Sequence, residues 1–378
     1  MIQLLRSNKN LILTGAPGTG KTYMAKQIAL MMLFNKESED ALTNTEKKIL
    51  HEQLCITQFH PSYDYTDFVE GLRPIQNENC NTISFERKDG IFKVFCEKAQ
   101  KKLNTCFDSI YTELKEEGEK QLTIENTTFS IKASNNDPNK INIQLKEDLP
   151  VEDTKIYIHK TPTCEEIKDS LKNAYELFDK YKIDKYPFIF IIDEINRGEI
   201  SKIFGELFFS IDPEYRGKKG RVQTQYANII KENDFFKEGF YVPENVYIIG
   251  TMNDIDRSVE CIDFAMRRRF AWKEISAKDS MSMLSVLGEF EDEAKDRLTA
   301  INNTIWNEET NEGIEGLSPS YHIGASYFLK LTKCNYDFHK LWENHLRGIL
   351  YEYLRGMPDA IQKMNLLENA YNFINDDE

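Results

Sequence analysis

The chain has 378 residues, a length that corresponds to about two or three domains. Apolar residues make up 40% of it and charged residues 29%, as expected for a globular protein with a sizeable core. Its 48 basic and 62 acidic residues give a net charge of −14, which argues against a surface that binds nucleic acid generally. The longest apolar run, 28–34, is far shorter than the roughly 20 residues that span a bilayer, and no signal peptide is evident. We therefore expect a cytoplasmic protein that does not enter the membrane.

The use of cysteine and histidine gives no indication of a metal centre. The seven cysteines include no CxxC pair, and the six histidines are dispersed along the chain. Reduced thiols are the better interpretation of this pattern than a zinc site or a disulfide framework.

The N-terminal part is predicted to alternate strands and helices. A short apolar strand, Leu11–Leu13, leads directly into Gly15–Thr22 and then into an apolar helical stretch. A second strand is predicted over Leu54–Phe59, and an amphipathic helix over Phe92–Ala99. This order of elements is typical of an α/β domain.

Residues from about 100 to 186 interrupt that order. Apolar residues alternate with polar ones there, as in half-buried strands, at Leu122, Ile124, Phe129, Ile131, Ile141, Ile143, Leu145, Ile156 and Ile158. Thr163 and Glu166 fit a capping box at the start of a further helix. We predict a small β-rich insertion that ends in a helix.

Two further apolar runs, Phe188–Ile192 and Val246–Gly250, predict strands that are buried on both faces, as in a parallel sheet. Beyond Trp272 the pattern is helical and acidic. We expect four segments. Residues 1–99 and 187–272 form the two parts of an α/β nucleotide-binding domain. Residues 100–186 form a β-rich insertion, and 273–378 a helical lid.

Gly15–Thr22 matches the pattern GxxxxGK[ST] of a phosphate-binding P-loop. Its glycines allow backbone N–H groups to turn toward phosphate oxygens at the start of a helix, where the helix dipole favours negative charge. Lys21 is expected to contact the β- and γ-phosphates, and Thr22 to offer its hydroxyl to Mg²⁺. The candidate nucleotide-binding residues are Gly15, Ala16, Pro17, Gly18, Thr19, Gly20, Lys21 and Thr22.

Polar side chains follow the two buried strands at their ends. Asp193 and Glu194 come directly after the first strand, and Asn253 follows the second. Because the carboxyl ends of parallel strands meet at one edge of a sheet, we expect these side chains to lie beside the P-loop. There Asp193 can hold Mg²⁺, Glu194 can act as a general base on the attacking water, and Asn253 can place an amide near the γ-phosphate.

Three consecutive arginines, Arg267, Arg268 and Arg269, follow a short helix that is predicted near 259–266. Arginine stabilises the charge that develops on transferring phosphoryl oxygens, and a neighbouring subunit can supply it. A solvated basic end of a helix explains the triplet equally well, because cations are favoured there. The residues by themselves leave both interpretations open.

Several linked stretches resemble a known family. They are Gly15–Thr22, Gln58–Tyr63, Asp193–Arg197, Gly250–Ser258 and Ala265–Phe270. Together they resemble the McrB-like AAA+ motor subunits of type IV, modification-dependent restriction systems, and the pattern Met-Asn-x-x-Asp-Arg-Ser is the most specific part. Two later stretches, 323–328 and 342–356, resemble the helical lid of this family. The matching parts run over about 9–100 and 186–356 and leave the insertion uncovered.

The resemblance implies a P-loop AAA+ fold, with three α/β/α layers around a parallel sheet and a C-terminal helical lid. It implies that Asp193 and Glu194 form Walker B, that Asn253 is sensor 1, and that Asp256 helps to organise the attacking water. Arg268 and Arg269 become the candidates for acting in trans on the nucleotide of a neighbouring subunit. The working form that follows is a ring, usually a hexamer in this family.

The same resemblance implies a function. We expect a Mg²⁺-dependent hydrolase of GTP, with ATP also possible, that powers a DNA-restriction complex together with an McrC-like nuclease subunit. DNA is expected to be bound through that complex rather than by this chain alone. Two rival hypotheses remain: an ATP-driven remodeller or chaperone of protein clients, and a scaffold that binds nucleotide without turnover.

Two features depart from the family pattern. The first predicted strand begins at Leu11, so we expect no DNA-reading domain upstream of it in this chain. The stretch 323–328 contains no arginine, so a sensor 2 arginine is not evident there.

Two weaker signals have competing interpretations. The basic run Arg216–Arg221 could line a pore and touch a phosphate backbone, but a solvated hairpin turn is preferred. The aromatic residues Phe59, Tyr63, Tyr65 and Phe68 could stack on bases, but packing within the protein is preferred.

Overall fold

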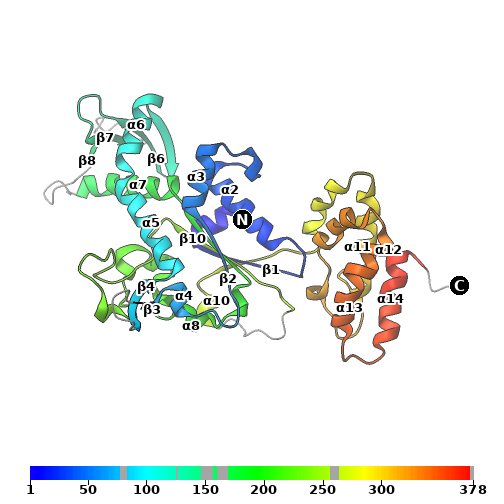
Figure 1. The fold of residues 1–378 in the computed structure, drawn as a ribbon. Helices are drawn as coiled ribbons and strands as arrows, with labels where there is room; N and C mark the ends of the chain where they lie inside the picture. Colours follow the sequence, from blue (N-terminus) through cyan, green and yellow to red (C-terminus); the bar gives the residue numbers. More distant parts are fainter. Residues whose placement is uncertain (77–82, 125–126, 146–155, 160–168, 256–263, 375–378) are drawn as a thin grey trace.

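The computed structural model describes residues 1–76, 83–124, 127–145, 156–159, 169–255 and 264–374 (Figure 1). Its centre is a parallel five-stranded sheet with the order β11-β1-β10-β9-β2. The strands are β1 Asn10–Thr14, β2 Leu54–Gln58, β9 Phe188–Asp193, β10 Val246–Thr251 and β11 Ala271–Glu274. The predicted strands at the P-loop, at Leu54 and at the two apolar runs are therefore confirmed.

Both faces of the sheet are buried, which explains the continuous apolar runs. Ile12, Phe190 and Ile248 point into one core, whereas Leu11 and Ile249 point into the core on the other face. Helices α1 and α2 cover the second face, and α4, α5 and α8 cover the first. The fold is a three-layer α/β/α sandwich. Its helices are α1 Ile2–Asn8, α2 Lys21–Phe34, α3 Asn44–Gln53, α4 Tyr65–Phe68, α5 Ile91–Thr105, α8 Ile200–Phe204, α9 Leu207–Ser210 and α10 Phe264–Arg267.

An aromatic cluster on the first face holds α4 and α5 on the sheet. Phe92 stacks on Phe68 with ring centroids 4.7 Å apart and meets Phe190 edge-on at 5.0 Å. Phe59 and Phe68 are fully buried, and Tyr63 stacks on Phe59. The preferred packing interpretation of these aromatic residues is therefore confirmed.

A two-stranded hairpin, β3 Glu70–Gln76 and β4 Ile83–Asp89, is fixed to the α/β part by buried charges. The carboxylate of Glu70 accepts hydrogen bonds from Arg87 and Lys93, each at 2.6 Å. Burial by itself raises the pKa of Glu70, but the hydrogen bond and the charge of Lys93, together with polar contacts from Thr224 and Tyr226, hold that pKa below its ordinary value. A paired charge network of this kind fixes the direction in which the hairpin leaves the core.

The β-rich insertion has its own core. Its four antiparallel strands, in the order β5-β6-β7-β8, pack against α6 Phe107–Glu117 and α7 Asp169–Lys185. The strands are β5 Lys120–Ile124, β6 Thr127–Ala133, β7 Lys140–Leu145 and β8 Ile156–His159. Phe129, Ile131, Ile141, Ile143 and Ile158 are buried, as their alternation predicts. The capping residues Thr163 and Glu166 lie outside the described residues.

The C-terminal part is helical and stands on the opposite side of the molecule from the insertion (Figure 1). It begins with the 3₁₀ segment Asp279–Phe290, and its remaining helical elements are α11 Glu291–Ile305, the 3₁₀ segment Ala325–Cys334, α12 Phe338–Leu341, the π turn Trp342–Leu346, α13 Arg347–Leu354 and α14 Ala360–Asn372. A short hairpin, β12 Trp306–Asn307 and β13 Glu312–Gly313, interrupts them. Among the described residues, no helix is both long and apolar enough to cross a bilayer.

Two local predictions differ from the structure. β11 was not predicted, because this four-residue edge strand is half exposed and has no apolar run to mark it. In the basic run, Arg216 is buried in the core rather than solvated, and only Lys218 and Lys219 are exposed as a turn predicts. Arg216 can be buried because backbone carbonyls and a side-chain amide accept its hydrogen bonds.

We expect Phe92→Ala to lower the free energy of unfolding by about 3–5 kcal/mol, because it removes the ring at the centre of the aromatic cluster. The matched control is Val94→Ala on the same helix, where the side chain is 38% exposed and the loss is expected to stay within about 1 kcal/mol. Urea denaturation followed by fluorescence measures both. Equal losses for the two variants would contradict this account of the core.

Candidate nucleotide-binding site

The P-loop connects the end of β1 to the start of α2. Gly15, Gly18 and Gly20 have φ angles of 140°, 81° and 83°, which residues with a side chain rarely adopt. Gly20 directly precedes α2, so the amide groups of the loop lie at the positive end of that helix. Lys21 is buried, and its ammonium donates to the carbonyls of Gly15 and Ala16 at 2.9 and 2.8 Å. The loop thus has the backbone form of a phosphate cradle with a lysine beneath it.

The carboxylate of Asp193 links the end of β9 to the end of β10 and to the start of α2. Its Oδ1 accepts hydrogen bonds from the hydroxyls of Thr22 and Thr251, both at 2.6 Å. The hydroxyl of Thr251 in turn accepts from the backbone N–H of Glu194 at 3.2 Å. Hydroxyl and carboxylate oxygens are the ligands that Mg²⁺ prefers, and these two lie at the start of α2 beside the P-loop. The pair Thr22 and Asp193 therefore fits a magnesium ion.

Glu194 stands in the left-handed region, with φ 51°, which turns its side chain out of the line of β9. Its Oε1 accepts a hydrogen bond from the amide of Asn253 at 2.7 Å, and Arg197 lies 3.4 Å from its Oε2. Asn196 donates to the backbone carbonyl of Asn253 at 3.5 Å. The strained turn and these contacts hold a carboxylate and an amide together next to Asp193.

Asp254, beside Asn253, is an acidic group that the sequence analysis did not single out. Its backbone N–H donates to the carbonyl of Gly15 at 3.4 Å. Burial raises its pKa, the nearby carboxylate of Glu274 raises it further, and Lys21 opposes both effects. Asp256, the expected organiser of the attacking water, lies outside the described residues.

The helical part contacts the P-loop directly. The backbone N–H of Gly324 donates to the carbonyl of Pro17, and that of Ser326 to the carbonyl of Gly18, both at 3.0 Å. A Cβ at Gly18 would lie 2.5 Å from the ring of Tyr327. The stretch that was expected to form the lid thus closes over the phosphate-binding loop without an arginine.

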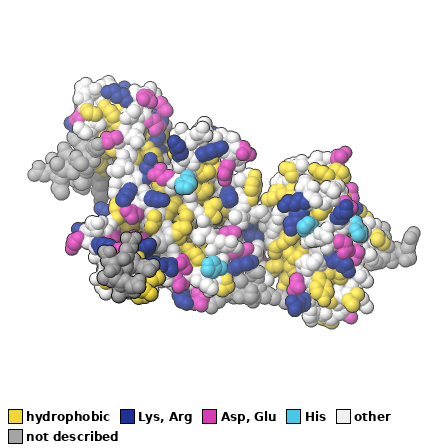
Figure 2. Space-filling view, viewed as in Figure 1, with side chains coloured by type: hydrophobic (Ala, Val, Ile, Leu, Met, Phe, Trp, Pro, Cys, Tyr) yellow, Lys and Arg dark blue, Asp and Glu magenta, His cyan; other side chains and the backbone are white. Residues whose placement is uncertain are grey.

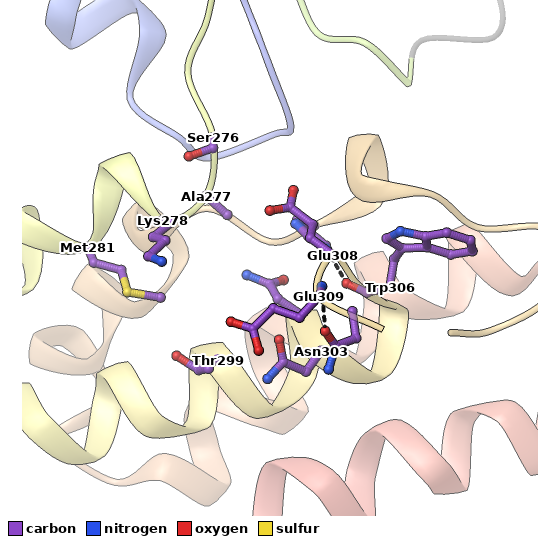
Figure 3. A pocket seen from close by; sticks show the side chains of 12 residues that line it. Ser276, Ala277, Lys278, Met281, Thr299, Asn303, Trp306, Glu308 and Glu309 are labelled. Atoms are coloured by element: carbon purple, nitrogen blue, oxygen red, sulfur yellow. Dashed lines mark hydrogen bonds between the residues drawn. The ribbon is translucent and has the colours of Figure 1, made fainter. Parts of the chain in front are cut away.

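The linker between β11 and the helical part is packed on one side and open on the other. The carbonyl of Ile275 lies against Gly15, at 2.2 Å from the position of an ideal Cβ. Next along the chain, Ser276 and Lys278 line a cavity of about 260 Å³, whose far wall includes Thr299 and Asn303 (Figure 3). The linker therefore packs on the P-loop at Ile275 and forms one wall of this cavity at 276–278.

The arginine triplet lies at the other end of β1. The carbonyl of Arg269 accepts a hydrogen bond from the side chain of Asn10, the first residue of that strand. Arg267 lies over the ring of Trp272 at 4.7 Å, and Arg269 lies over the ring of Phe208 at 5.6 Å. Arg268 is exposed, and its side chain has no hydrogen bond or ion pair with the residues that the structure describes. The structure thus gives the three arginines different surroundings, whereas the sequence does not show which of them could act on a neighbouring subunit.

Sequence reasoning missed Thr251 and the lid residues. Thr251 could have been found, because it directly precedes Met252 and Asn253 at the end of a buried strand. Ser326 and Tyr327 carry no such signal, since only the docking of the helical part brings them to the P-loop.

Comparisons with known proteins agree with this geometry. The model of the AAA domain (dynein-related subfamily) matches residues 143–270. The McrB subunit of the type IV methyl-directed restriction enzyme EcoKMcrB of Escherichia coli (strain K12) is 29% identical over 87% of this chain and 49% of its own length. YdiS, a component of the type II restriction enzyme BsuMI of Bacillus subtilis (strain 168), is 24% identical over 70% of this chain and 56% of its own length.

The chain has a P-loop AAA+ fold and is similar to an McrB subunit. It spans about half the length of the curated relatives that it matches. The solved structure of PCH-2 from C. elegans aligns over 99% of this chain and 63% of its own, at 13% identity and a TM-score of 0.24, which is too low to support any conclusion.

We expect Gly324→Ala to weaken nucleotide binding at least about tenfold, or by about 1.4 kcal/mol. A Cβ at this position would lie 2.0 Å from the carbonyl carbon of Gly18, so the lid must withdraw and disturb the loop. Gly348→Ala is the matched control, because a Cβ there meets nothing within 4 Å. Titration with a fluorescent nucleotide measures both, and unchanged binding in Gly324→Ala would contradict the closed arrangement.

Proposed function

We propose that this protein is a Mg²⁺-dependent nucleoside triphosphatase that assembles as a ring and drives a DNA-restriction complex with an McrC-like nuclease subunit. The observation that carries the proposal is the shared carboxylate of Asp193, which joins Thr22 at the P-loop to Thr251 and so to Glu194. Within the chain, 1–99 and 187–272 form the motor domain of this proposal, with 100–186 as an insertion and 273–378 as the lid.

Each residue of the site has a task that follows from its position. The backbone amides of Gly15–Gly20 and the ammonium of Lys21 bind the phosphates at the start of α2. Thr22 and Asp193 would hold Mg²⁺, which would neutralise negative charge on the phosphates. Glu194 takes the proton of the attacking water, and the amide of Asn253, 2.7 Å away, orients that carboxylate and the water. Asp256 assists in placing the water.

The proposed ring follows from where the arginines lie. Arg269 is anchored at the first residue of β1, whereas the P-loop follows its last residue. A five-residue strand is roughly 15 Å long, so the triplet faces away from the phosphates of its own subunit. Arg267 and Arg269 lie over aromatic rings, which leaves the exposed Arg268 as the candidate to act on the nucleotide of an adjacent subunit. A hexamer is the ring that we expect.

DNA is proposed to be engaged through the complex. Figure 2 shows basic and acidic side chains interspersed over the face in view, without a broad basic area among the described residues. The net charge of −14 is consistent with this view. The relatives are named as parts of a type IV methyl-directed and a type II restriction enzyme, which supports a role in restriction. The proposed preference for GTP over ATP rests on the resemblance of the sequence to the McrB-like family.

We expect hydrolysis of GTP, and more weakly of ATP, to require Mg²⁺ and to rise steeply with protein concentration, because neighbouring subunits complete each site. Glu194→Gln is expected to bind nucleotide but to lower turnover by at least about 100-fold. Phosphate release measured for both nucleotides in parallel checks this. A preference for ATP without an effect of the nuclease subunit would favour the remodeller of protein clients, and binding without turnover would favour the scaffold.

Arg268→Ala is expected to lower kcat by about 1,000-fold without weakening nucleotide binding, because it removes the charge offered to the neighbouring site. Arg267→Ala is the matched control and is expected to lower kcat less than about tenfold, since its guanidinium is stacked on Trp272. Steady-state kinetics at saturating nucleotide separates the two. A larger effect at Arg267 would refute the assignment.

A further inference from the structure

Asn10 joins three segments that are distant in the sequence. Its side chain is fully buried at the start of β1. The amide donates to the carbonyls of Ile211 and Arg269, both at 2.8 Å, and its oxygen accepts from the guanidinium of Arg216. Both N–H groups and the oxygen are therefore used, so the amide has one orientation. We call Asn10 and Arg216 together the β1 clamp.

Arg216 completes the clamp from the interior. Its side chain is 1% exposed, and its Nε donates to the same carbonyl of Ile211 at 3.1 Å. Another of its nitrogens donates to the carbonyl of Val246 at 3.3 Å. Burial lowers the pKa of Arg216 to about 10, so the guanidinium is still charged at neutral pH. A charged donor buried among carbonyls holds these segments more firmly than a neutral one.

The clamp determines where the arginine triplet lies. It fixes the backbone of Arg269, while the side chain of that residue lies on Phe208 and 3.8 Å from Asp212. Arg269 is thus held at its carbonyl by Asn10 of β1 and at its guanidinium by Phe208 of α9 and by Asp212. Its neighbour Arg268 is left pointing into solvent from a fixed backbone.

We propose that Asn10 is a positioning residue for hydrolysis. It holds the carbonyl of Arg269 against β1 and thereby fixes where the adjacent Arg268 meets the neighbouring subunit. This inference rests on the proposed function, in which Arg268 acts in trans. It assigns Arg269 to positioning rather than to the transferred phosphate. It also explains why a buried strand begins with an asparagine, a residue that is depleted in strands.

The test uses Asn10→Asp in the full chain. This variant keeps the size of the side chain and an ion-pair partner for Arg216, but it places carboxylate oxygens against the carbonyls of Ile211 and Arg269. Asn8→Asp is the matched control, because the same change there affects only contacts to Leu4 and Ser7. Circular dichroism checks folding, and light scattering checks assembly. If Asn10→Asp does not fold, Arg269→Met serves as a second variant, because it leaves the buried amide of Asn10 unchanged.

We expect Asn10→Asp to lower kcat at least about tenfold, with the dissociation constant for nucleotide changed less than about twofold. The decisive readout is mixing with Glu194→Gln, whose own sites are inactive but whose Arg268 is intact. Random mixing gives about a quarter of the sites an active Glu194 together with a correctly placed neighbouring Arg268, so activity should reappear. Arg268→Ala mixed with Glu194→Gln is the positive control and should recover equally.

Recovery in both mixtures supports the proposal, because a defect confined to the variant's own site would not be rescued by its neighbour. If activity recovers in the mixture of Glu194→Gln with Arg268→Ala but not in the mixture with Asn10→Asp, the positioning role is overturned and the proposed function stands. Wild-type turnover in Asn10→Asp alone would overturn it as well. Failure of both mixtures would refute the action of Arg268 in trans, and the positioning of Arg268 with it.

Discussion

The parallel register of β1, β10 and β9 is the constraint on which the rest of the site depends. Leu13 pairs with Thr251, and Gly250 pairs with Ile192, so the three strands end at one level. The P-loop, Thr251 and Asp193 are therefore brought to the same edge, where two hydroxyls meet one carboxylate. None of the three strands could shift by one residue without moving all of its own side chains to the opposite face of the sheet.

Buried polar groups fix the outlying parts of the molecule relative to this sheet. Glu70, Arg87 and Lys93 attach the β3–β4 hairpin, and Asn10 and Arg216 attach the segment that bears the arginines. Such groups contribute less to stability than apolar residues of the same size, because their desolvation offsets much of their attraction. What these groups provide is a defined orientation, since their hydrogen bonds form only when the joined segments lie in one relative placement.

The helical part is joined to the P-loop by hydrogen bonds between backbone groups. Gly18 and Gly324 face each other so closely that a Cβ on either would meet the opposite segment. This close approach lets the amides of Gly324 and Ser326 bond to carbonyls of the loop. The site is thus built from both ends of the chain, and the position of the helical part directly affects the loop that is proposed to bind phosphate.

The sequence by itself determined the sheet strands that carry the P-loop, Asp193 and Asn253, because apolar runs and glycine patterns reflect local burial and backbone geometry. It also indicated the β-rich insertion from alternation alone. Tertiary structure decided the rest: the edge strand β11, the burial of Arg216, the hydrogen bonds of Thr251, and which two of the three arginines lie over aromatic rings. These features depend on which distant segment supplies a hydrogen-bond partner or a covering ring, and no local pattern records that choice.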